Sequence, residues 1–158
     1  MFFGKPTTVL SNERVRFPWG KSTIMNPLDD RTTCGTIGEL LVQLRLFLYG
    51  VQASPPLKDS GNDLIAVRGE VFRAIQVKTT RWCPRVRLYP IDRQYHLLAL
   101  VVLSDAEGFP SVSLDRTKIF LIPKSAACES TRSLEELGQF ELSQEAIDRA
   151  FAQPREAA

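Results

Sequence analysis

Apolar residues recur at steps of three and four between residues 37 and 51, and this spacing predicts an amphipathic helix. The predicted helix starts near Thr33, and Gly50 suits its C-terminal end. Glu39 then falls in the first helical turn, and Arg45 is the only other charged residue of the segment. The apolar positions that define the helix are Ile37, Leu40, Leu41, Leu44, Leu48 and Val51.

Short apolar runs follow this helix and predict strands separated by turn residues. The run at 95–103 is almost entirely apolar, which indicates a strand buried on both faces. Near the C-terminus, Ser143 is expected to cap a last helix through Phe151, and Ser133 with Glu136 has the spacing of a capping box for another helix, which Gly138 cuts short. The predicted strands cover residues 51–54, 63–67, 71–79, 95–103 and 118–122.

The order of helix, strands and helix predicts an α/β domain. Residues 1–31 lack sustained periodicity and are expected to form a poorly ordered N-terminal arm. Residues 32–125 are expected to form the core domain, and residues 126–158 an acidic helical segment packed on that core.

The amino-acid composition and charge exclude several classes of protein. The 158 residues are 44% hydrophobic and 24% charged, which is enough apolar material for a buried core. The net charge is only +2, which excludes a protein that binds nucleic acid through general positive charge. No apolar run is long enough to cross a bilayer and no signal peptide is evident, so we expect a cytoplasmic protein with no membrane partner.

Residue types that build common catalytic sites are scarce. The three cysteines, Cys34, Cys83 and Cys128, lack the spacing of a zinc site or a disulfide framework. The single histidine, His96, lies in an apolar run and is expected to be a packed structural residue. No glycine-rich phosphate loop occurs in a strand-to-helix context, so no organic cofactor is expected.

Charge is distributed unevenly along the chain. The segment 68–93 has a local charge of +5, and the residues from 127 onward have a local charge of −4. The basic segment fits either a phosphate-binding face or a solvated hairpin edge. Trp82 and Tyr89 lie among its arginines, where they either stack on exposed bases or anchor a loop to the core. The arginines expected to contact DNA phosphates are Arg81, Arg85, Arg87 and Arg93.

Polar residues converge at one end of a predicted hairpin. A two-residue loop at Gly69-Glu70 pairs residues whose numbers sum to 139. Asp63 then lies opposite Gln76, and Lys78 points to the same face as Gln76. A carboxylate, an amide and an ammonium group are therefore predicted at the open end of the hairpin.

This combination suits a hard divalent cation, because Mg²⁺ takes oxygen ligands from one or two carboxylates together with water and phosphate. Asp63 offers a carboxylate, Gln76 an amide oxygen and Val77 a backbone carbonyl. Lys78 would lie beside a metal-bound water and phosphate, an arrangement suited to phosphodiester hydrolysis. Glu39 is the candidate for a second carboxylate; its alternative interpretation is a stabilising charge near a helix N-terminus.

Three short motifs resemble the PD-(D/E)xK nuclease superfamily, in particular its small homing-endonuclease-like and Holliday-junction-resolvase-like branch, which uses a Gln-x-Lys motif. The motifs are Gly38-Glu39, Asn62-Asp63-Leu64-Ile65 and Ile75-Gln76-Val77-Lys78-Thr79, and Ile119-Phe120-Leu121-Ile122-Pro123 is similar to a later strand of that branch. The resemblance covers about residues 34–125. It implies a restriction-endonuclease-like mixed central sheet flanked by helices, a DNA substrate, Mg²⁺ or Mn²⁺ as cofactor, and an active site of Glu39, Asp63, Gln76 and Lys78.

The sequence departs from this family at two positions. Asn62 stands where the superfamily has proline, and Gln76 replaces an acidic ligand, which removes a negative charge from the metal site. A DNA-binding protein without catalysis on the same fold is therefore an alternative, and a protein-interaction module that uses the acidic C-terminal segment is another. Because one site cuts one strand, cleavage of both strands predicts a two-fold symmetric homodimer.

Overall fold

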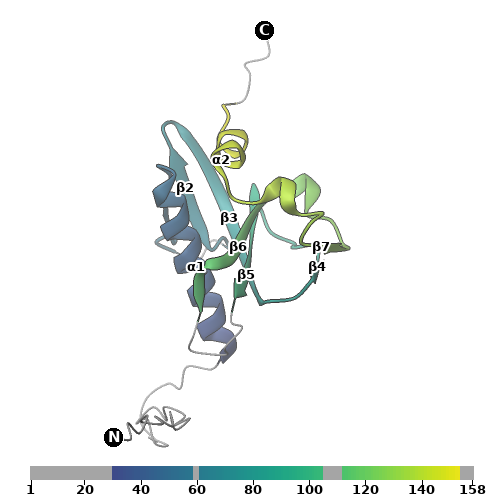
Figure 1. The fold of residues 1–158 in the computed structure, drawn as a ribbon. Helices are drawn as coiled ribbons and strands as arrows, with labels where there is room; N and C mark the ends of the chain where they lie inside the picture. Colours follow the sequence, from purple (N-terminus) through teal and green to yellow (C-terminus); the bar gives the residue numbers. More distant parts are fainter. Residues whose placement is uncertain (1–29, 59–60, 105–111, 154–158) are drawn as a thin grey trace, which may run out of the picture.

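A five-stranded mixed sheet forms the centre of the protein, with helices packed against it (Figure 1). The structure, a computed structural model, describes residues 30–58, 61–104 and 112–153. The strand order is β1-β2-β3-β5-β6; β3 and β5 run parallel, and the other neighbours run antiparallel. The predicted fold class is confirmed, whereas residues 1–29 of the predicted arm lie outside the described residues. The elements are α1 (Asp30–Leu48), β1 (Gln52–Ser54), β2 (Leu64–Arg68), β3 (Val71–Arg81), β4 (Arg85–Leu88), β5 (Leu97–Ser104), β6 (Ser113–Pro123), η1 (Lys124–Ala126), β7 (Ser130–Ser133), η2 (Gly138–Phe140) and α2 (Gln144–Ala150).

Helix α1 begins at Asp30, three residues before its predicted start. The extra residues are polar, so apolar periodicity could not detect them. Glu39 consequently lies in the middle of α1, and its predicted position in the first turn is wrong. An interaction with the helix N-terminus does not account for Glu39, because that effect falls off within the first turn.

Strands β2 and β3 form the predicted hairpin. Arg68 pairs with Val71 and Leu64 with Ile75, so the predicted register is confirmed. Gly69 opens the two-residue turn with φ of 59°, a left-handed conformation that a side chain would disfavour. Continuing this register by one residue beyond the Leu64–Ile75 pair places Asp63 opposite Gln76 at the end of the ladder.

Side-chain alternation along the strands gives the sheet two apolar faces. Helices α1 and α2 cover one face, where Leu46 and Ile147 join the buried side chains of alternate strand positions. Strands β4 and β7 cover the other face, and Figure 1 shows this pair on the side of the sheet away from α1. All eight residues of β5 are buried, which confirms that this strand is covered on both sides.

The two-stranded sheet of β4 and β7 was not predicted. Arg85 pairs with Ser133, and Leu88 pairs with Ser130. Along β4 the arginines point outward, while Val86 and Leu88 point into the core. β7 contains no apolar residue, so its sequence offers no alternation from which a strand could be predicted.

His96 occupies a different environment from the predicted one. The prediction of a packed strand residue is wrong, because β5 begins at Leu97 and the His96 residue is exposed. Its Nδ1 accepts a hydrogen bond from the Ala74 N–H at 2.9 Å, and its own N–H donates to the Ala74 carbonyl at 2.9 Å. His96 therefore joins the start of β5 to β3.

The capping box near the C-terminus forms, but it does not start an α-helix. The Ser133 N–H donates to Glu136 Oε2 at 2.6 Å, and the Glu136 N–H donates to Ser133 Oγ at 3.2 Å. A turn and the short 3₁₀ helix η2 follow, because Gly138 interrupts the segment. The predicted helix at this position is therefore wrong.

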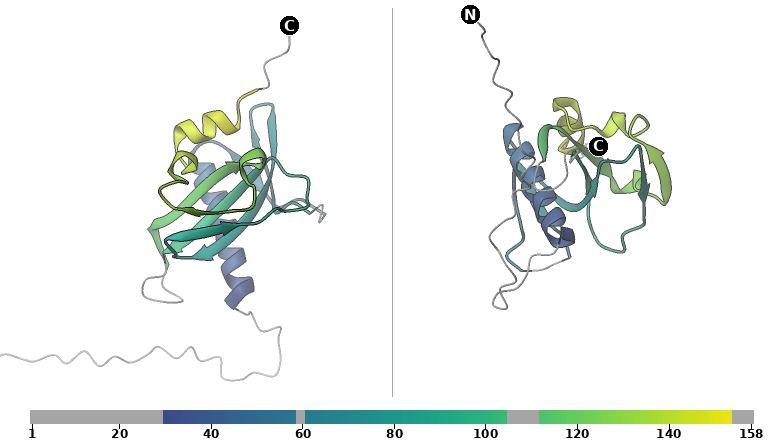
Figure 2. Two further views of the ribbon diagram at one scale, coloured as in Figure 1. Left: turned by 90° about the vertical axis from the view of Figure 1, so that its right-hand side faces the viewer. Right: turned by 60° about the horizontal axis from the view of Figure 1, so that its bottom comes forward.

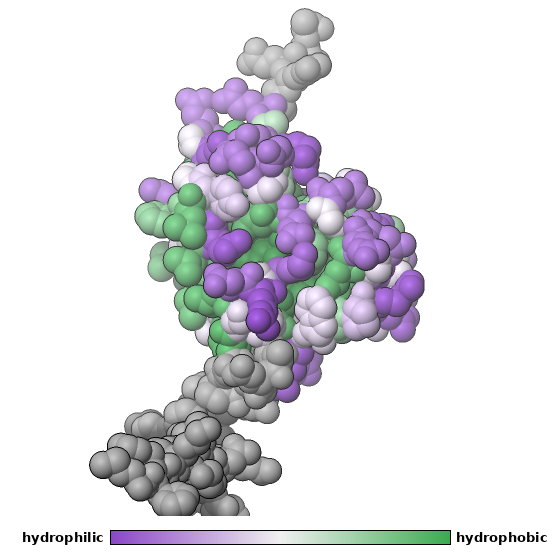
Figure 3. Space-filling model, viewed as in Figure 1, coloured by the Kyte–Doolittle hydropathy of each residue, from purple (hydrophilic) through white to green (hydrophobic). Residues whose placement is uncertain are grey.

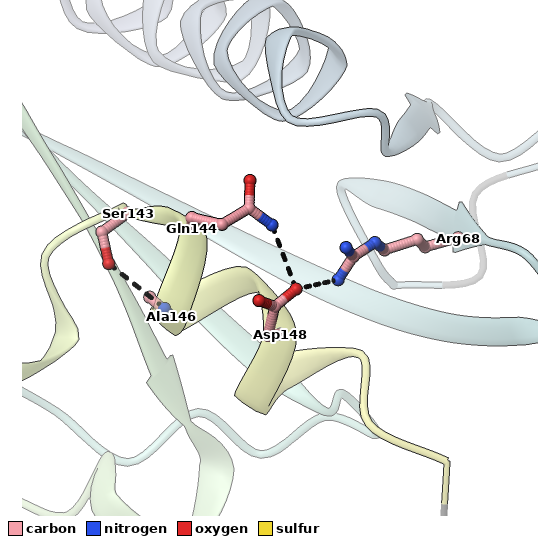
Figure 4. Close-up of polar contacts among 5 residues, drawn as sticks. All are labelled: Arg68, Ser143, Gln144, Ala146 and Asp148. Carbon is pink, nitrogen blue, oxygen red and sulfur yellow. Dashed lines mark hydrogen bonds and ion pairs between the residues drawn. The ribbon is translucent and has the colours of Figure 1, made fainter.

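Helix α2, drawn in yellow in Figure 2, packs into the same core cluster as α1 and is fixed at both ends (Figure 4). Ser143 caps it as predicted, with its Oγ accepting from the Ala146 N–H at 3.2 Å. Asp148 accepts hydrogen bonds from Arg68 at 2.6 Å and from Gln144 at 3.0 Å, which ties α2 to the end of β2. Within the described part of the chain, no helix has both the length and the apolar character needed to cross a membrane.

Candidate functional site

The Asp63 carboxylate is held in a fixed orientation at the point where the β2–β3 ladder ends. The Asp63 N–H donates to the Ile75 carbonyl at 3.2 Å. Asp63 Oδ2 accepts hydrogen bonds from the Val77 N–H at 2.6 Å and from Gln76 Nε2. The side chain thus takes the place of a strand partner for Val77, and among the described residues only one of its two oxygens is hydrogen-bonded.

The side chain of Gln76 is buried, and only part of its hydrogen-bonding capacity is used. The residue is 4% exposed, and its Nε2 is engaged with Asp63. Its Oε1 has no hydrogen-bond partner among the described residues, and the same is true of the buried Oδ1 of Asn62. Leaving such an atom unsatisfied costs about 1–3 kcal/mol, so both oxygens favour an additional ligand.

Val77 offers a backbone oxygen at the same place. The N–H and C=O groups of one strand residue point to the same edge of the strand. Because the Val77 N–H meets Asp63, the Val77 carbonyl also points toward the edge where β2 has ended. The structure therefore brings the residues Asp63, Gln76 and Val77 together, with the Gln76 amide nitrogen and the Val77 N–H, rather than their oxygens, on the Asp63 carboxylate.

Glu39 extends from α1, which packs on the opposite face of β3 from the Gln76 and Lys78 side chains. The charge of Asp63 nevertheless affects the ionisation of Glu39. Partial burial raises the pKa of the Glu39 carboxyl above its ordinary value of 4.5, and the negative charge of Asp63 raises it further. A carboxyl group whose ionisation is disfavoured by a neighbouring carboxylate is a common feature of cation-binding sites. The described residues contain no group of three or more His, Cys, Asp or Glu that could hold a metal ion.

Glycine at position 38 allows α1 to approach β3 beside Glu39. A Cβ at Gly38 would collide with the hydroxyl and the β-carbon of Thr79. The Thr79 Oγ1 is buried and has no hydrogen-bond partner among the described residues. The Gly38–Thr79 contact therefore fixes the distance of the helix from the sheet at the residue next to Glu39.

Lys78 lies on the Gln76 side of β3 and reaches solvent. Residues two apart in a strand share a face, and the Lys78 residue is exposed where Gln76 is buried. Its ammonium group makes no hydrogen bond or ion pair with the part of the chain that the structure describes. Lys78 is thus available to an anion that approaches Asp63 from this face.

The four arginines predicted to contact DNA have different surroundings. Arg81 ends β3 and is exposed. Arg85 lies near Glu136, whose pKa is lowered first by the hydrogen bond from Ser133 and to a smaller degree by Arg85. Arg87 forms an ion pair with Glu129 at 3.0 Å and stacks on Tyr89 at 4.7 Å.

Arg93 supports the loop that carries Asp63. Its Nη1 donates to the Gly61 carbonyl at 2.7 Å, and the Arg93 carbonyl accepts from Lys124 Nζ at 2.6 Å. This positioning role was missed at the sequence level, as was the buried oxygen of Asn62. A Gly-Asn-Asp run predicts a turn, but nothing in it indicates that the asparagine oxygen will be buried.

Comparison with solved structures adds a distant likeness. No family model matches the chain, and no curated protein matches it. Among solved structures, the chain is similar to that of a bacterial homing endonuclease, I-Ssp6803I, with 15% sequence identity and a TM-score of 0.46. The alignment covers 80% of this chain and 86% of that chain. A function for this protein therefore has to come from the chemistry of the site itself.

Proposed function

We propose that the protein is a Mg²⁺-dependent DNA endonuclease that hydrolyses phosphodiester bonds. One observation carries this proposal: Asp63 is held by Gln76 and Val77, while the buried Gln76 Oε1 has no hydrogen-bond partner within residues 30–58, 61–104 and 112–153. Glu39 supplies a second carboxylate, close enough for the charge of Asp63 to raise its pKa. This oxygen set suits a hard divalent cation bound by one or two carboxylates.

The ligands for the ion would be Asp63, Glu39, the Gln76 amide oxygen and the Val77 carbonyl. When bound there, Mg²⁺ would polarise a phosphate and lower the pKa of a coordinated water. Mn²⁺ accepts the same oxygen ligands and is expected to substitute. Gln76 Nε2 and the Val77 N–H orient the Asp63 carboxylate before any ion arrives, so little reorganisation is needed.

Lys78 provides the positive charge on the exposed side of the site. Its ammonium group can donate hydrogen bonds to a phosphate oxygen and to the attacking water, which stabilises negative charge that develops during hydrolysis. Arg81 and Arg85 are exposed along the same region of the chain and would hold neighbouring phosphates. Arg87 and Arg93 would do the same from positions held by Glu129 and by the Gly61 carbonyl.

The direct test is cleavage of plasmid and branched DNA in the presence of Mg²⁺. Asp63→Ala and Lys78→Ala are expected to lower the rate by about 100-fold or more, because each removes a group that acts at the scissile phosphate. Arg116→Ala is the matched control, since it removes an exposed positive charge from β6, two strands away from β3. Equal rates for wild type and all three variants would contradict the proposal.

A DNA-binding protein without catalysis is the second candidate, and one contact favours it. The Gln76 side-chain amide donates a hydrogen bond to the Asp63 carboxylate, so this carboxylate is stabilised without a cation. Under this alternative the protein retains DNA without cleaving it in Mg²⁺ or Mn²⁺. The observation behind a protein-interaction module is weaker, because Glu129, Glu141 and Asp148 of the acidic segment pair with Arg87, Lys118 and Arg68.

Cleavage of both DNA strands would require two copies, and α1 offers a surface for a second copy. Leu40, Leu44, Phe47 and Leu48 are 59%, 49%, 67% and 70% exposed and lie on one stripe of the helix. Figure 3 shows apolar side chains gathered along the α1 side of the molecule.

A groove of about 190 Å³ runs beside this stripe, between α1 and β6. Leu44, Leu48 and Leu114 line the groove, and Phe47 projects from the same helix. A two-fold axis would let each copy insert its Phe47 into the groove of the other, which is the self-complementarity that an isologous interface needs. We therefore propose that the homodimer forms through α1.

A further inference from the structure

A cavity of about 290 Å³ opens beside Lys78, on the face of the sheet away from α1. Its floor is apolar and consists of buried leucines of β5 together with the inward-facing side chains of β4. The volume lies just below the range of about 300–1,000 Å³ that small-molecule sites occupy, which suits a single ring system. The lining residues are Lys78, Thr79, Thr80, Cys83, Arg85, Val86, Arg87, Leu88, Tyr89, Ile91, Leu98 and Leu100.

The lining carries positive charge and no negative charge. Lys78, Arg85 and Arg87 contribute to it, and the lining contains neither Asp nor Glu. Apolar walls with cations around them suit a ligand that has a flat apolar part and an anionic part. A nucleotide has this composition, because its base is a flat ring and its phosphate is charged.

Tyr89 forms an aromatic platform on this cavity. The residue is 54% exposed, and the Arg87 guanidinium lies 4.7 Å from its ring centroid. Arg87 is in turn held by Glu129 at 3.0 Å. The ring is thus restrained while one part of it faces solvent, and bases stack on such aromatic rings with little dependence on sequence.

Trp82 has a similar exposure but a different location. It is 55% exposed and does not line this cavity; it lines shallow depressions formed with β6 and the segment around Ser133. The structure therefore separates two aromatic residues that the sequence presents as equivalent. Only Tyr89 is placed where a base in the cavity would stack.

We propose that this cavity binds one unstacked nucleobase of the DNA strand whose phosphate lies at Asp63 and Lys78. Lys78 connects the cavity with the candidate site at Asp63, since it lines the cavity and shares a strand face with Gln76. This inference rests on the proposed function and specifies its substrate class. Because unstacking is cheapest for a base that is already unpaired, the preferred DNA carries a bulge, flap or branch next to the scissile bond.

The first test measures binding of two DNA duplexes that differ only in one bulged nucleotide, in EDTA so that no cleavage occurs. Wild type is expected to bind the bulged duplex at least about 10-fold more tightly than the matched duplex. Tyr89→Ala should abolish this preference, while Trp82→Ala, with the same loss of an exposed aromatic ring, should retain it. Equal affinities for the two duplexes, or equal effects of the two substitutions, would overturn the proposal.

A second measurement uses the wild-type protein, without any substitution. Cys83 lines the cavity, whereas Cys128 is an exposed thiol that does not. Saturating bulged DNA is expected to slow alkylation of Cys83 by iodoacetamide about 10-fold relative to saturating matched DNA, and to leave Cys128 unaffected. Equal alkylation of Cys83 under both conditions would contradict base binding in the cavity.

The results distinguish this inference from the function on which it rests. If matched plasmid is nicked in Mg²⁺ and the bulge gives no preference, the nuclease proposal stands and the base-binding cavity is overturned. If the bulge preference depends on Tyr89 but no DNA is cleaved, the cavity stands and catalysis is overturned. If no DNA binds even at low salt, both are overturned.

Discussion

The Gln76 side-chain amide donates a hydrogen bond to the Asp63 carboxylate across the open end of the β2–β3 hairpin. A glutamate at position 76 could not make this contact, because two ionised carboxylates would repel each other. The amide therefore lets the site form without a cation, while its own oxygen is left for one. This relationship yields a direct prediction for position 76.

Gln76→Glu is expected to destabilise the metal-free protein by about 1–3 kcal/mol at pH 7, because it replaces a hydrogen bond by a like-charge contact. Mg²⁺ should then raise the melting temperature of this variant more than that of wild type, since a cation relieves the repulsion. The measurement is thermal unfolding in EDTA and in Mg²⁺. Combining Gln76→Glu with Asp63→Asn restores an amide–carboxylate pair and should recover the metal-free stability. If Mg²⁺ does not change the melting temperature of the Gln76→Glu variant, this result would argue against the metal site.

Glu39 is expected to make stability depend on pH in a defined direction. Its folded-state pKa is raised above the ordinary value of 4.5, so the folded protein binds more protons than the unfolded chain just above that value. Stability associated with Glu39 is therefore lost as the pH rises from 4.5 through the folded-state pKa. In EDTA, Glu39→Gln should be more stable than wild type at pH 7 and equally stable at pH 4. Urea unfolding at the two pH values measures this, and a Glu39→Gln variant that is less stable at pH 7 would contradict it.

Gly38→Ala is expected to destabilise the protein by about 1–3 kcal/mol, because the new methyl group collides with Thr79 and forces α1 away from β3. The same shift would move Glu39 and reduce Mg²⁺ binding. Gly35→Ala is the matched control: it lies in the same helix, its Cβ would meet nothing within 4 Å, and it should stabilise by up to about 1 kcal/mol. Chemical unfolding of both variants measures the difference. Similar stabilities would show that the helix does not depend on this close approach.

Leu44→Glu is expected to prevent association through α1, because it places a charge in the middle of the apolar stripe. Wild type should sediment as a dimer at micromolar concentration and the variant as a monomer, with unchanged far-ultraviolet circular dichroism. Leu57→Glu introduces the same charge at a fully exposed leucine in the β1–β2 connection and should leave the dimer intact. A monomeric wild type at every concentration tested would rule out this interface.

The hairpin shows what could be read from the sequence. Gly69-Glu70 fixes the turn, and the turn fixes the register, so the pairing of Arg68 with Val71 and the placement of Asp63 opposite Gln76 followed directly. The apolar run of β5 was equally informative, because a strand covered on both faces needs no polar positions.

Other features depend on contacts between distant segments, which local patterns do not contain. β7 is recognisable only through its pairing with β4, and Arg93 acquires its role through the carbonyl of Gly61, far away in sequence. The buried oxygen of Asn62 and the unequal positions of Trp82 and Tyr89 likewise follow from tertiary packing. Glu39 was assigned to the helix that contains it but to the wrong turn, because the polar start of α1 has no apolar signature.

The antiparallel pairing of β4 with β7 has a consequence for synthesis on the ribosome. β4 is made before β5 and β6, yet its partner strand emerges only after both of them. Until then Leu98 and Leu100 of β5 lack their cover, so the nascent chain exposes an apolar surface for the time needed to translate the intervening segment. Protection of that surface by a chaperone, or rapid completion of the chain, would decide the yield of folded protein.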